Sequence, residues 1–146
     1  MVKVRLTTSE QCEWVVSGDR SVTQEERAKL RQGELTSEFK IRESGSDQTP
    51  QLVELRYQPN AEIRVHSHDE DEIMYVLEGS MRVNNRTVGP GACLYIAGRT
   101  FYGFHAGPDG LHILNFRPRQ DTTFNLPPDT NRDASPSRQP MPGKTE

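Results

Sequence analysis

The chain has 146 residues, which suits a single domain with a modest core, and 32% of these residues are hydrophobic. Its formal net charge of −3 gives no reason to expect a nucleic-acid or anionic-membrane partner. No apolar run is long enough to span a membrane, and residues 1–14 lack the apolar stretch of a signal peptide. Cys12 and Cys93 form no C-x-x-C pattern, which favours free buried thiols over a disulfide. We therefore expect a cytoplasmic protein.

Residues 1–50 are predicted to form an N-terminal extension that packs on the main domain. Apolar and charged residues alternate over residues 2–6, which indicates a strand, and residues 14–16 are a second short apolar run. A capping box opens residues 23–32, which are predicted to be a helix, and residues 39–41 predict a further strand. No catalytic motif appears in the extension, so we interpret it as structural.

From residue 51 the chain is divided into short strands by glycine, proline and asparagine, the pattern of a β-sandwich or barrel. The predicted strands are residues 52–57, 63–68, 73–77, 81–83, 87–88, 92–96, 100–104 and 111–116. In the third of these, Met74 and Val76 are predicted to point inward. The outward residues are also apolar: Ile73, Tyr75 and Leu77. A second subunit or the N-terminal strands must cover them, and we predict a homodimer.

Residues 120–146 differ in character from the rest of the chain. They hold five of the ten prolines and few apolar side chains, so they bury too little surface to offset their ordering entropy. We predict an extended or disordered tail. Phe124, Leu126 and Met141 are its candidates for docking on the main domain or on a partner subunit.

His66 and His68 lie two residues apart, so on a strand both imidazoles project from one face. Glu72 follows four residues after His68, close enough to join them after a short turn. Two neutral imidazoles and one carboxylate leave open positions on a divalent metal, an arrangement typical of non-haem Fe(II) and also accepted by Zn, Ni or Mn. The alternative is a pair of surface histidines in an acidic turn.

The flanking residues resemble the first motif of the cupin family, G-x5-H-x-H-x3-4-E-x6-G. His66, His68, Glu72 and Gly79 stand at the motif's intervals, and Asn60 replaces its first glycine. Asparagine, like glycine, tolerates a turn with positive φ. This motif is specific, so it favours a metal site over a pair of surface histidines.

The resemblance covers about residues 51–117 and implies an all-β fold. The expected structure is a single-domain cupin, a double-stranded β-helix or jelly-roll barrel, because the chain shows no internal duplication. We place the barrel at residues 51–119, between the N-terminal extension and the proline-rich tail. Small cupins commonly dimerise, which agrees with the homodimer prediction.

The second cupin motif, G-x5-P-x-G-x2-H-x3-N, is only partly kept. Gly91 fits its first position, whereas Ala97 replaces the proline and Arg99 replaces the second glycine. Tyr102 occupies the place of the usual fourth metal ligand, a histidine. The phenol is a candidate for metal ligation, for a hydrogen bond to substrate, or for packing.

Two other histidines are candidates for completing the site. His105 is expected to face away from Tyr102 unless Gly103 breaks the strand alternation. His112 shares a strand face with Leu114 and Phe116, which suggests an inward position and a ligand role.

Arg64 is predicted to share the inward face of His66 and His68. Its guanidinium offers a planar, bidentate fork for a substrate carboxylate. The alternative is a structural ion pair with Glu62 or Glu54.

Three functions compete. The first is a metal-dependent, dioxygenase-type oxidoreductase for a small carboxylate, ketone or phenol, with Tyr102 and Arg64 as catalytic residues. The second is a non-redox lyase, isomerase or hydrolase that uses the metal as a Lewis acid. The third is a small-molecule-binding or sensory module without turnover. The metal that copurifies discriminates among them, because the fold alone does not.

Overall fold

A computed structural model describes residues 3–20, 23–28 and 30–128 of the chain. Met141 and the rest of residues 129–146, the larger part of the predicted tail, lie outside the described residues. Within the described ranges, no helix has the length and apolar character needed to cross a membrane.

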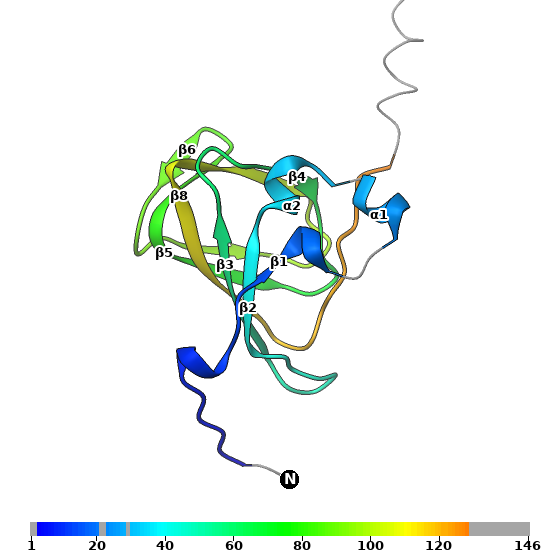
Figure 1. Ribbon diagram of the computed structural model, residues 1–146, viewed down its shortest axis with the longest axis vertical. Helices are drawn as coiled ribbons and strands as arrows, with labels where there is room; N and C mark the ends of the chain where they lie inside the picture. The colour runs from blue at the N-terminus through cyan, green and yellow to red at the C-terminus, as the bar shows by residue number, and fades with distance from the viewer. Residues whose placement is uncertain (1–2, 21–22, 29, 129–146) are drawn as a thin grey trace, which may run out of the picture.

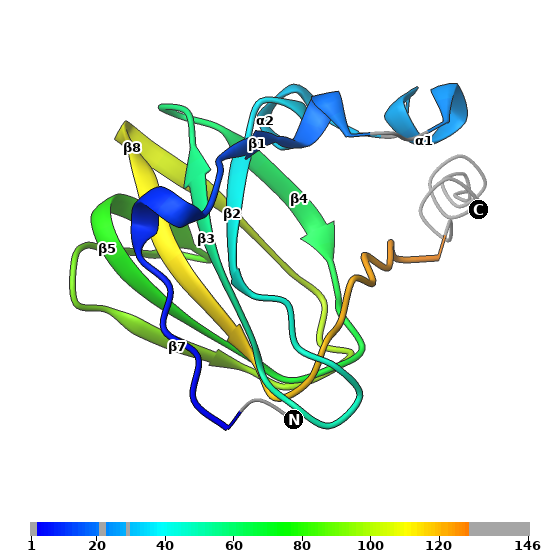
Figure 2. The same cartoon turned by 60° about the horizontal axis from the view of Figure 1, so that its bottom comes forward.

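An antiparallel sheet of eight strands curls into a barrel in the described part of the chain (Figures 1 and 2). The strands are β1 (Val15–Val16), β2 (Glu38–Glu43), β3 (Gln51–Tyr57), β4 (Glu62–His66), β5 (Glu72–Val83), β6 (Arg86–Val88), β7 (Cys93–Ile96) and β8 (Tyr102–Arg117). Their order is β1-β2-β3-β8-β5-β6, while β4 pairs with β8 and β7 pairs with β5. This architecture confirms the all-β barrel that the sequence predicts.

Two long strands, β5 and β8, replace four of the predicted short ones. Gly79 pairs with Leu111 and Met81 pairs with Ala106, so residues 107–110 bulge out of β8 between these pairs. The predicted division of this region into separate strands at residues 100–104 and 111–116 was therefore wrong. Bulges of this kind bend a strand, which lets β5 and β8 follow the curve of the barrel.

The core lies inside the barrel and follows the predicted alternation along β5. Met74, Val76 and Met81 of β5 are at most 1% exposed, and Ile113 of β8 is fully buried beside them. Each such side chain contributes roughly 1.5–3 kcal/mol relative to exposure. The same alternation brings Glu72 to the interior at the start of β5.

The outer face of β5 carries exposed apolar side chains. Ile73 is 38% exposed and Tyr75 is 44% exposed, as their predicted outward orientation requires. Ile73 pairs with Tyr95 of β7 on one side and with Phe116 of β8 on the other, and both of these are exposed as well. The homodimer prediction rests on this apolar row and stays a prediction.

Three of the positions at which the cupin motifs call for glycine have positive φ, and of these three the chain keeps glycine at one. Asn60, in place of the first glycine, has φ of 61°, as predicted for that turn. Gly79 has φ of 78°, and a Cβ there would come within 2.1 Å of the Gly110 carbonyl oxygen, so glycine is required. Arg99, in place of a glycine, also has positive φ, 64°, which costs a non-glycine residue roughly 1 kcal/mol.

The N-terminal extension differs from its prediction. Residues 3–8 form no strand, and Val4 and Leu6 are exposed, so the predicted strand was wrong. Short 3-10 helices span Ser9–Gln11 and Ser17–Asp19. The helix predicted at residues 23–32 is observed in part as α1 (Gln24–Ala28), and a second short helix, α2 (Gln32–Leu35), begins where the predicted one ends.

Both cysteines are free, as predicted, but neither is buried. Cys12 is half-buried and Cys93 is exposed. The prediction of buried thiols was therefore wrong, because Cys93 lies on the outward face of β7, directly opposite the exposed Tyr75.

His112 lies on the outer face of β8, away from the barrel interior. Its Nε2 donates to a carboxylate oxygen of Glu54 at 2.9 Å, because a carboxylate only accepts, and its ring meets Trp14 edge-on at 5.7 Å. The inward residues of β8 are Ile113 and its alternate neighbours. His112 is the direct neighbour of Ile113, and neighbouring residues of a strand point to opposite faces of the sheet. The predicted inward position of His112 was therefore wrong.

Glu54 is the centre of this polar cluster under the extension. It accepts hydrogen bonds from Arg42 of β2 at 2.8 Å and from His112 of β8. Burial alone would raise the pKa of Glu54, but the hydrogen bonds from Arg42 and His112 outweigh it and hold the pKa below its ordinary value of 4.5. The ionised carboxylate therefore connects three neighbouring strands.

We predict that Glu54→Gln lowers the free energy of unfolding by about 1–3 kcal/mol at pH 7, since Arg42 loses its buried partner. Denaturant unfolding followed by the fluorescence of Trp14 measures the change. Because the folded pKa is depressed, the contribution of Glu54 is present above pH 4.5 and is lost as the pH falls through the folded pKa.

Glu78→Gln is the matched control, because Glu78 also approaches His112 but its side chain is 81% exposed. This substitution should change stability by less than about 0.5 kcal/mol. Equal effects of the two substitutions would contradict the structural role of Glu54.

Candidate functional site

A cavity of about 870 Å³, partly open to solvent, lies in the barrel. Four of the predicted site residues line it: Arg64, His66, His68 and Tyr102. Glu72 lies beside them and is 1% exposed. His105 instead lines a separate cavity of about 220 Å³, and His112 lies on the outer face of the sheet. The structure therefore brings together five of the predicted residues and leaves both remaining histidines outside.

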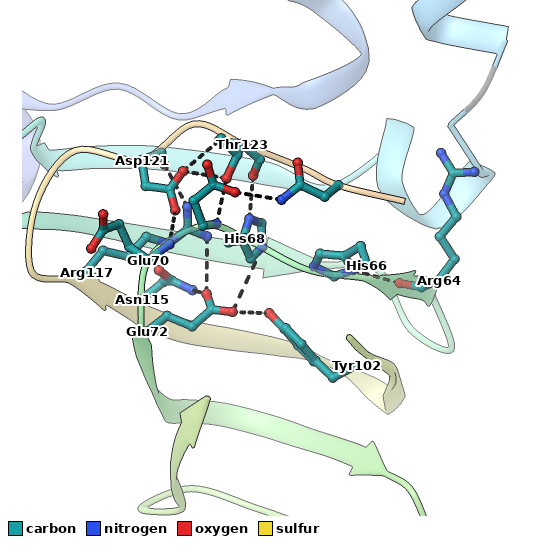
Figure 3. A network of polar contacts seen from close by, with 12 residues as sticks. Arg64, His66, His68, Glu70, Glu72, Tyr102, Asn115, Arg117, Asp121 and Thr123 are labelled. Carbon is teal, nitrogen blue, oxygen red and sulfur yellow. Dashed lines mark hydrogen bonds and ion pairs between the residues drawn. The ribbon is translucent and has the colours of Figure 1, made fainter. Parts of the chain in front are cut away.

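His66 and His68 each use Nδ1 to contact a backbone carbonyl (Figure 3). The carbonyl of Arg64 accepts from His66 at 2.7 Å, and the carbonyl of Thr123 accepts from His68. Because a carbonyl only accepts, Nδ1 carries the proton in both rings and Nε2 keeps a free lone pair. The ring centroids are 4.8 Å apart, so two such nitrogens lie at one end of the cavity.

Both imidazoles are neutral at pH 7. Burial lowers the pKa of His66 from 6.5 to about 4. Burial also lowers the pKa of His68, and the charge of Arg117 lowers it further. Neutral imidazole is the form that binds a metal ion or accepts a proton, so both rings are in the reactive state.

Glu72 is a buried carboxylate whose two oxygens already accept hydrogen bonds. Tyr102 donates to Oε1 at 2.5 Å, Asn115 donates to Oε2 at 2.8 Å, and Arg117 lies 3.2 Å from Oε2. Burial would raise the pKa of Glu72, but the charge of Arg117 and these contacts outweigh it, so the pKa is lowered. The group is ionised, and its Oε1 lies 3.9 Å from Nε2 of His68.

Tyr102 is a neutral phenol that donates to Glu72. Burial raises the pKa of its hydroxyl, and the charge of Glu72 raises it further. Its ring stacks on Phe104 at 6.3 Å, as the shared strand face predicts, and tilts against His66 at 4.8 Å. Tyr102 therefore holds a proton at the centre of the site and is not poised as a phenolate.

Arg64 lines the cavity but does not pair with either predicted partner. Its Nε lies 3.3 Å from Glu34 of α2, and Glu62 pairs with Arg31 instead. The register of β4 shifts between Ile63 and His66, which breaks the strict alternation on which the prediction rested. The Nε of Arg64 is buried without a hydrogen bond, although its backbone N–H donates to Glu34.

Residues 121–126, here called the strap, form one wall of the site (Figure 3). Asn125 and Ser67 exchange two backbone hydrogen bonds of 2.8 and 2.9 Å beside the histidines. Phe124 stacks on His66 with ring centroids 4.4 Å apart. The described part of the predicted tail is therefore extended and docked, and Phe124 is one of its docking residues.

Asp121 shapes the strap. Its carboxylate accepts from the N–H of Glu70 at 2.8 Å and from the N–H and hydroxyl of Thr123 at 2.9 and 2.6 Å. This turn presents the Thr123 carbonyl to His68. Arg117 connects the strap to Glu72, because it also donates to the Asp121 carbonyl at 2.7 Å.

The sequence prediction missed four of the polar residues that complete the site: Glu34, Asn115, Arg117 and Asp121. Asn115 and Arg117 could have been found from the sequence, because they lie two and four residues after the apolar Ile113 and therefore share its face of β8. Glu34 and Asp121 come from segments outside the cupin motifs, and no local pattern marks them.

The donors fit a divalent metal ion in their chemistry. Each histidine fixes Nδ1 on a carbonyl, which is the usual second contact of a metal-binding imidazole. Among the described residues, however, no three His, Cys, Asp or Glu side chains converge as a complete metal-binding group. His66 and His68 would hold the ion, while Glu72, occupied by three donors, supplies a neighbouring negative charge.

Comparisons with known proteins identify the fold. No protein-family model matches the chain, and no curated protein matches it by sequence. An RmlC-like cupin from Ralstonia eutropha is similar with a TM-score of 0.63 and 13% identity, over 81% of this chain and 70% of that one.

Two further solved structures are similar to this chain. KdgF from a Halomonas species is similar with a TM-score of 0.58 and 22% identity, over 81% of this chain and 96% of that one. The polyketide cyclase RemF from Streptomyces resistomycificus is similar with a TM-score of 0.53 and 25% identity, over 64% of this chain and 74% of that one. The chain therefore has the cupin fold, as its first motif implied.

We predict that Asp121→Ala loosens the strap, because the turn that carries Thr123 loses three accepted hydrogen bonds. The free energy of unfolding should fall by about 1–3 kcal/mol, and proteolysis within residues 121–128 should become faster. Asp109→Ala, at an exposed aspartate in the bulge of β8, is the control and should leave both measurements unchanged. Unchanged cleavage in Asp121→Ala would contradict the anchoring role of this carboxylate.

Proposed function

We propose that this chain, a protein of the cupin fold, is an enzyme that acts on an organic anion with the help of a divalent metal ion. The observation that carries the proposal is the pair of neutral imidazoles, His66 and His68, with Nδ1 bound to carbonyls and Nε2 free. When bound, the ion would supply Lewis acidity and open coordination positions. Fe(II) is our first choice, and a dioxygenase-type oxidation is the reaction proposed first.

Arg64 and Tyr102 are the residues that we assign to the substrate. The Arg64 guanidinium lines the cavity, and its contact with Glu34, through the buried Nε at 3.3 Å, is an ion pair without a hydrogen bond, so we assign a substrate carboxylate to this guanidinium. Tyr102 keeps its proton and donates a hydrogen bond to Glu72, so a phenolic O–H remains at this end of the cavity. Phe104 and Met74 exclude water from this end, because both are almost fully buried.

A non-redox lyase, isomerase or hydrolase is the second candidate, and the contact between Tyr102 and Glu72 favours it. The phenol keeps its proton, because burial and the charge of Glu72 raise its pKa, and its O–H now donates a hydrogen bond to Oε1 of Glu72 at 2.5 Å. In such a reaction this O–H would donate a hydrogen bond to a substrate oxygen on which negative charge develops.

We predict that the protein, purified without added metal, contains a stoichiometric divalent metal that the double variant His66→Ala/His68→Ala loses. Elemental analysis by mass spectrometry measures the content. Iron supports the oxidoreductase, whereas zinc or nickel supports the non-redox enzyme. His105→Ala removes a histidine from the separate cavity and should keep the metal.

Two outcomes would contradict the metal proposal. One is full retention of metal in the double variant while His105→Ala also retains it, which would place the ion elsewhere. The other is a wild-type protein that takes up no divalent metal on titration, which would favour a binding module without turnover.

We predict that Tyr102→Phe keeps the metal but loses at least about tenfold in kcat, or roughly 1.4 kcal/mol of transition-state stabilisation. The reason is that only the hydroxyl and its hydrogen bond to Glu72 are removed. Tyr57→Phe is the control, because Tyr57 lines the same cavity and has no hydrogen bond to Glu72. Loss of metal from Tyr102→Phe would instead make the phenol a ligand.

A further inference from the structure

The cavity has an apolar wall made by the strand of the N-terminal extension and its neighbour in the barrel. Phe39 of β2 pairs directly with Leu55 of β3, and Ile41 pairs directly with Val53. Residues paired in this way point to the same face, and all four line the cavity. We call these four residues the apolar plate. The extension was interpreted from the sequence as structural, with no part in the site, so this wall was not predicted.

The described chain covers the apolar plate only in part. Ile41 is 47% exposed, and the other three residues are only half-buried. Phe124 and Leu126 of the strap line the same cavity and are each 38% exposed. Apolar surface left in water within a partly open cavity favours a ligand that covers it.

The volume of the cavity also argues against a small substrate. A volume of about 870 Å³ lies near the upper end of the range for sites that bind drug-sized ligands. A carboxylic acid of two to four carbons at the histidine end would leave the apolar plate in contact with water. The cavity is therefore built for a ligand with a substantial apolar body.

The charged side chains of the cavity indicate the sign of the charge on the ligand. Its acidic residues have protein partners: Glu34 accepts from two backbone N–H groups, and Asp121 accepts from the strap. The guanidinium of Arg20 lies 5.6 Å over the ring of Phe39, and within the described residues it has no carboxylate partner. Arg64 also lines the cavity and contacts Glu34 through Nε at 3.3 Å, so one of these two guanidinium groups already has a carboxylate partner.

We propose that the substrate of this site is an amphipathic carboxylate, whose head binds at Arg64 and whose long alkyl or fused-ring body covers the apolar plate. This inference rests on the proposed function, because it uses the same cavity. It replaces the small organic acid expected from the sequence with a larger and more apolar molecule.

Isothermal titration of the full chain with butanoate, octanoate and dodecanoate tests the inference. Affinity should rise by up to about fourfold for each added methylene that is buried, so octanoate should bind about 100-fold more tightly than butanoate. Ile41→Ser/Val53→Ser should reduce the difference to less than about tenfold. Ile73→Ser is the matched control, since Ile73 is an exposed isoleucine on the outer face of β5, and it should keep the full difference.

A second variant covers the case in which the double variant does not fold. Ile41→Trp fills space beside the apolar plate, and it should weaken dodecanoate at least about tenfold more than butanoate. Arg64→Gln tests the head-group site, and it should weaken all three acids by a similar factor.

The outcomes separate the inference from the proposed function. Equal affinity for all three acids, lost in Arg64→Gln, would overturn the apolar body while the anion site stands. A chain-length effect that survives in the plate variants but is lost in Ile73→Ser would place the acids on the outer face and overturn the inference. Failure of every acid to bind would overturn the inference and the anion site, leaving the metal proposal to its own measurement.

Discussion

The rest of the site depends on one buried carboxylate, Glu72, and on the three donors that surround it. An ionised group at 1% exposure loses its hydration, a cost of several kcal/mol, unless hydrogen bonds and charge replace the water. Tyr102, Asn115 and Arg117 provide that replacement, and all three belong to β8. The polar contacts therefore fasten β5 to β8 at the end of the barrel where the histidines lie.

The contact with Arg117 carries this constraint into a segment far away in the sequence. Arg117 also binds the carbonyl of Asp121, whose side chain folds the strap so that the Thr123 carbonyl meets His68. The tautomer of His68 thus depends on a chain of contacts that begins at Glu72. His66 needs no such support, because its Nδ1 binds the carbonyl of Arg64 on its own strand.

This difference explains how much could be predicted from the sequence. The strands, the inward position of Met74 and the grouping of His66 with His68 follow from local alternation, and the cupin motif added Glu72 and the turn at Asn60. The position of His112 failed because Leu114 and Phe116, the apolar residues that share its face, lie on the outer face of β8, where Phe116 is 38% exposed. The roles of Asp121 and Glu34 could not be predicted, since they arise only when distant segments meet.

The two ends of the cavity are built by different elements, and this separation has a chemical consequence. β4, β5 and β8 hold the polar groups, whereas Phe39 and Ile41 come from β2, which joins the barrel only through its pairing with β3. Substitutions on the cavity face of β2 are therefore expected to change the space for a ligand more than the positions of the imidazoles or Glu72. Under the proposed function, the extension helps to select the substrate, and through Glu34 it also contacts Arg64.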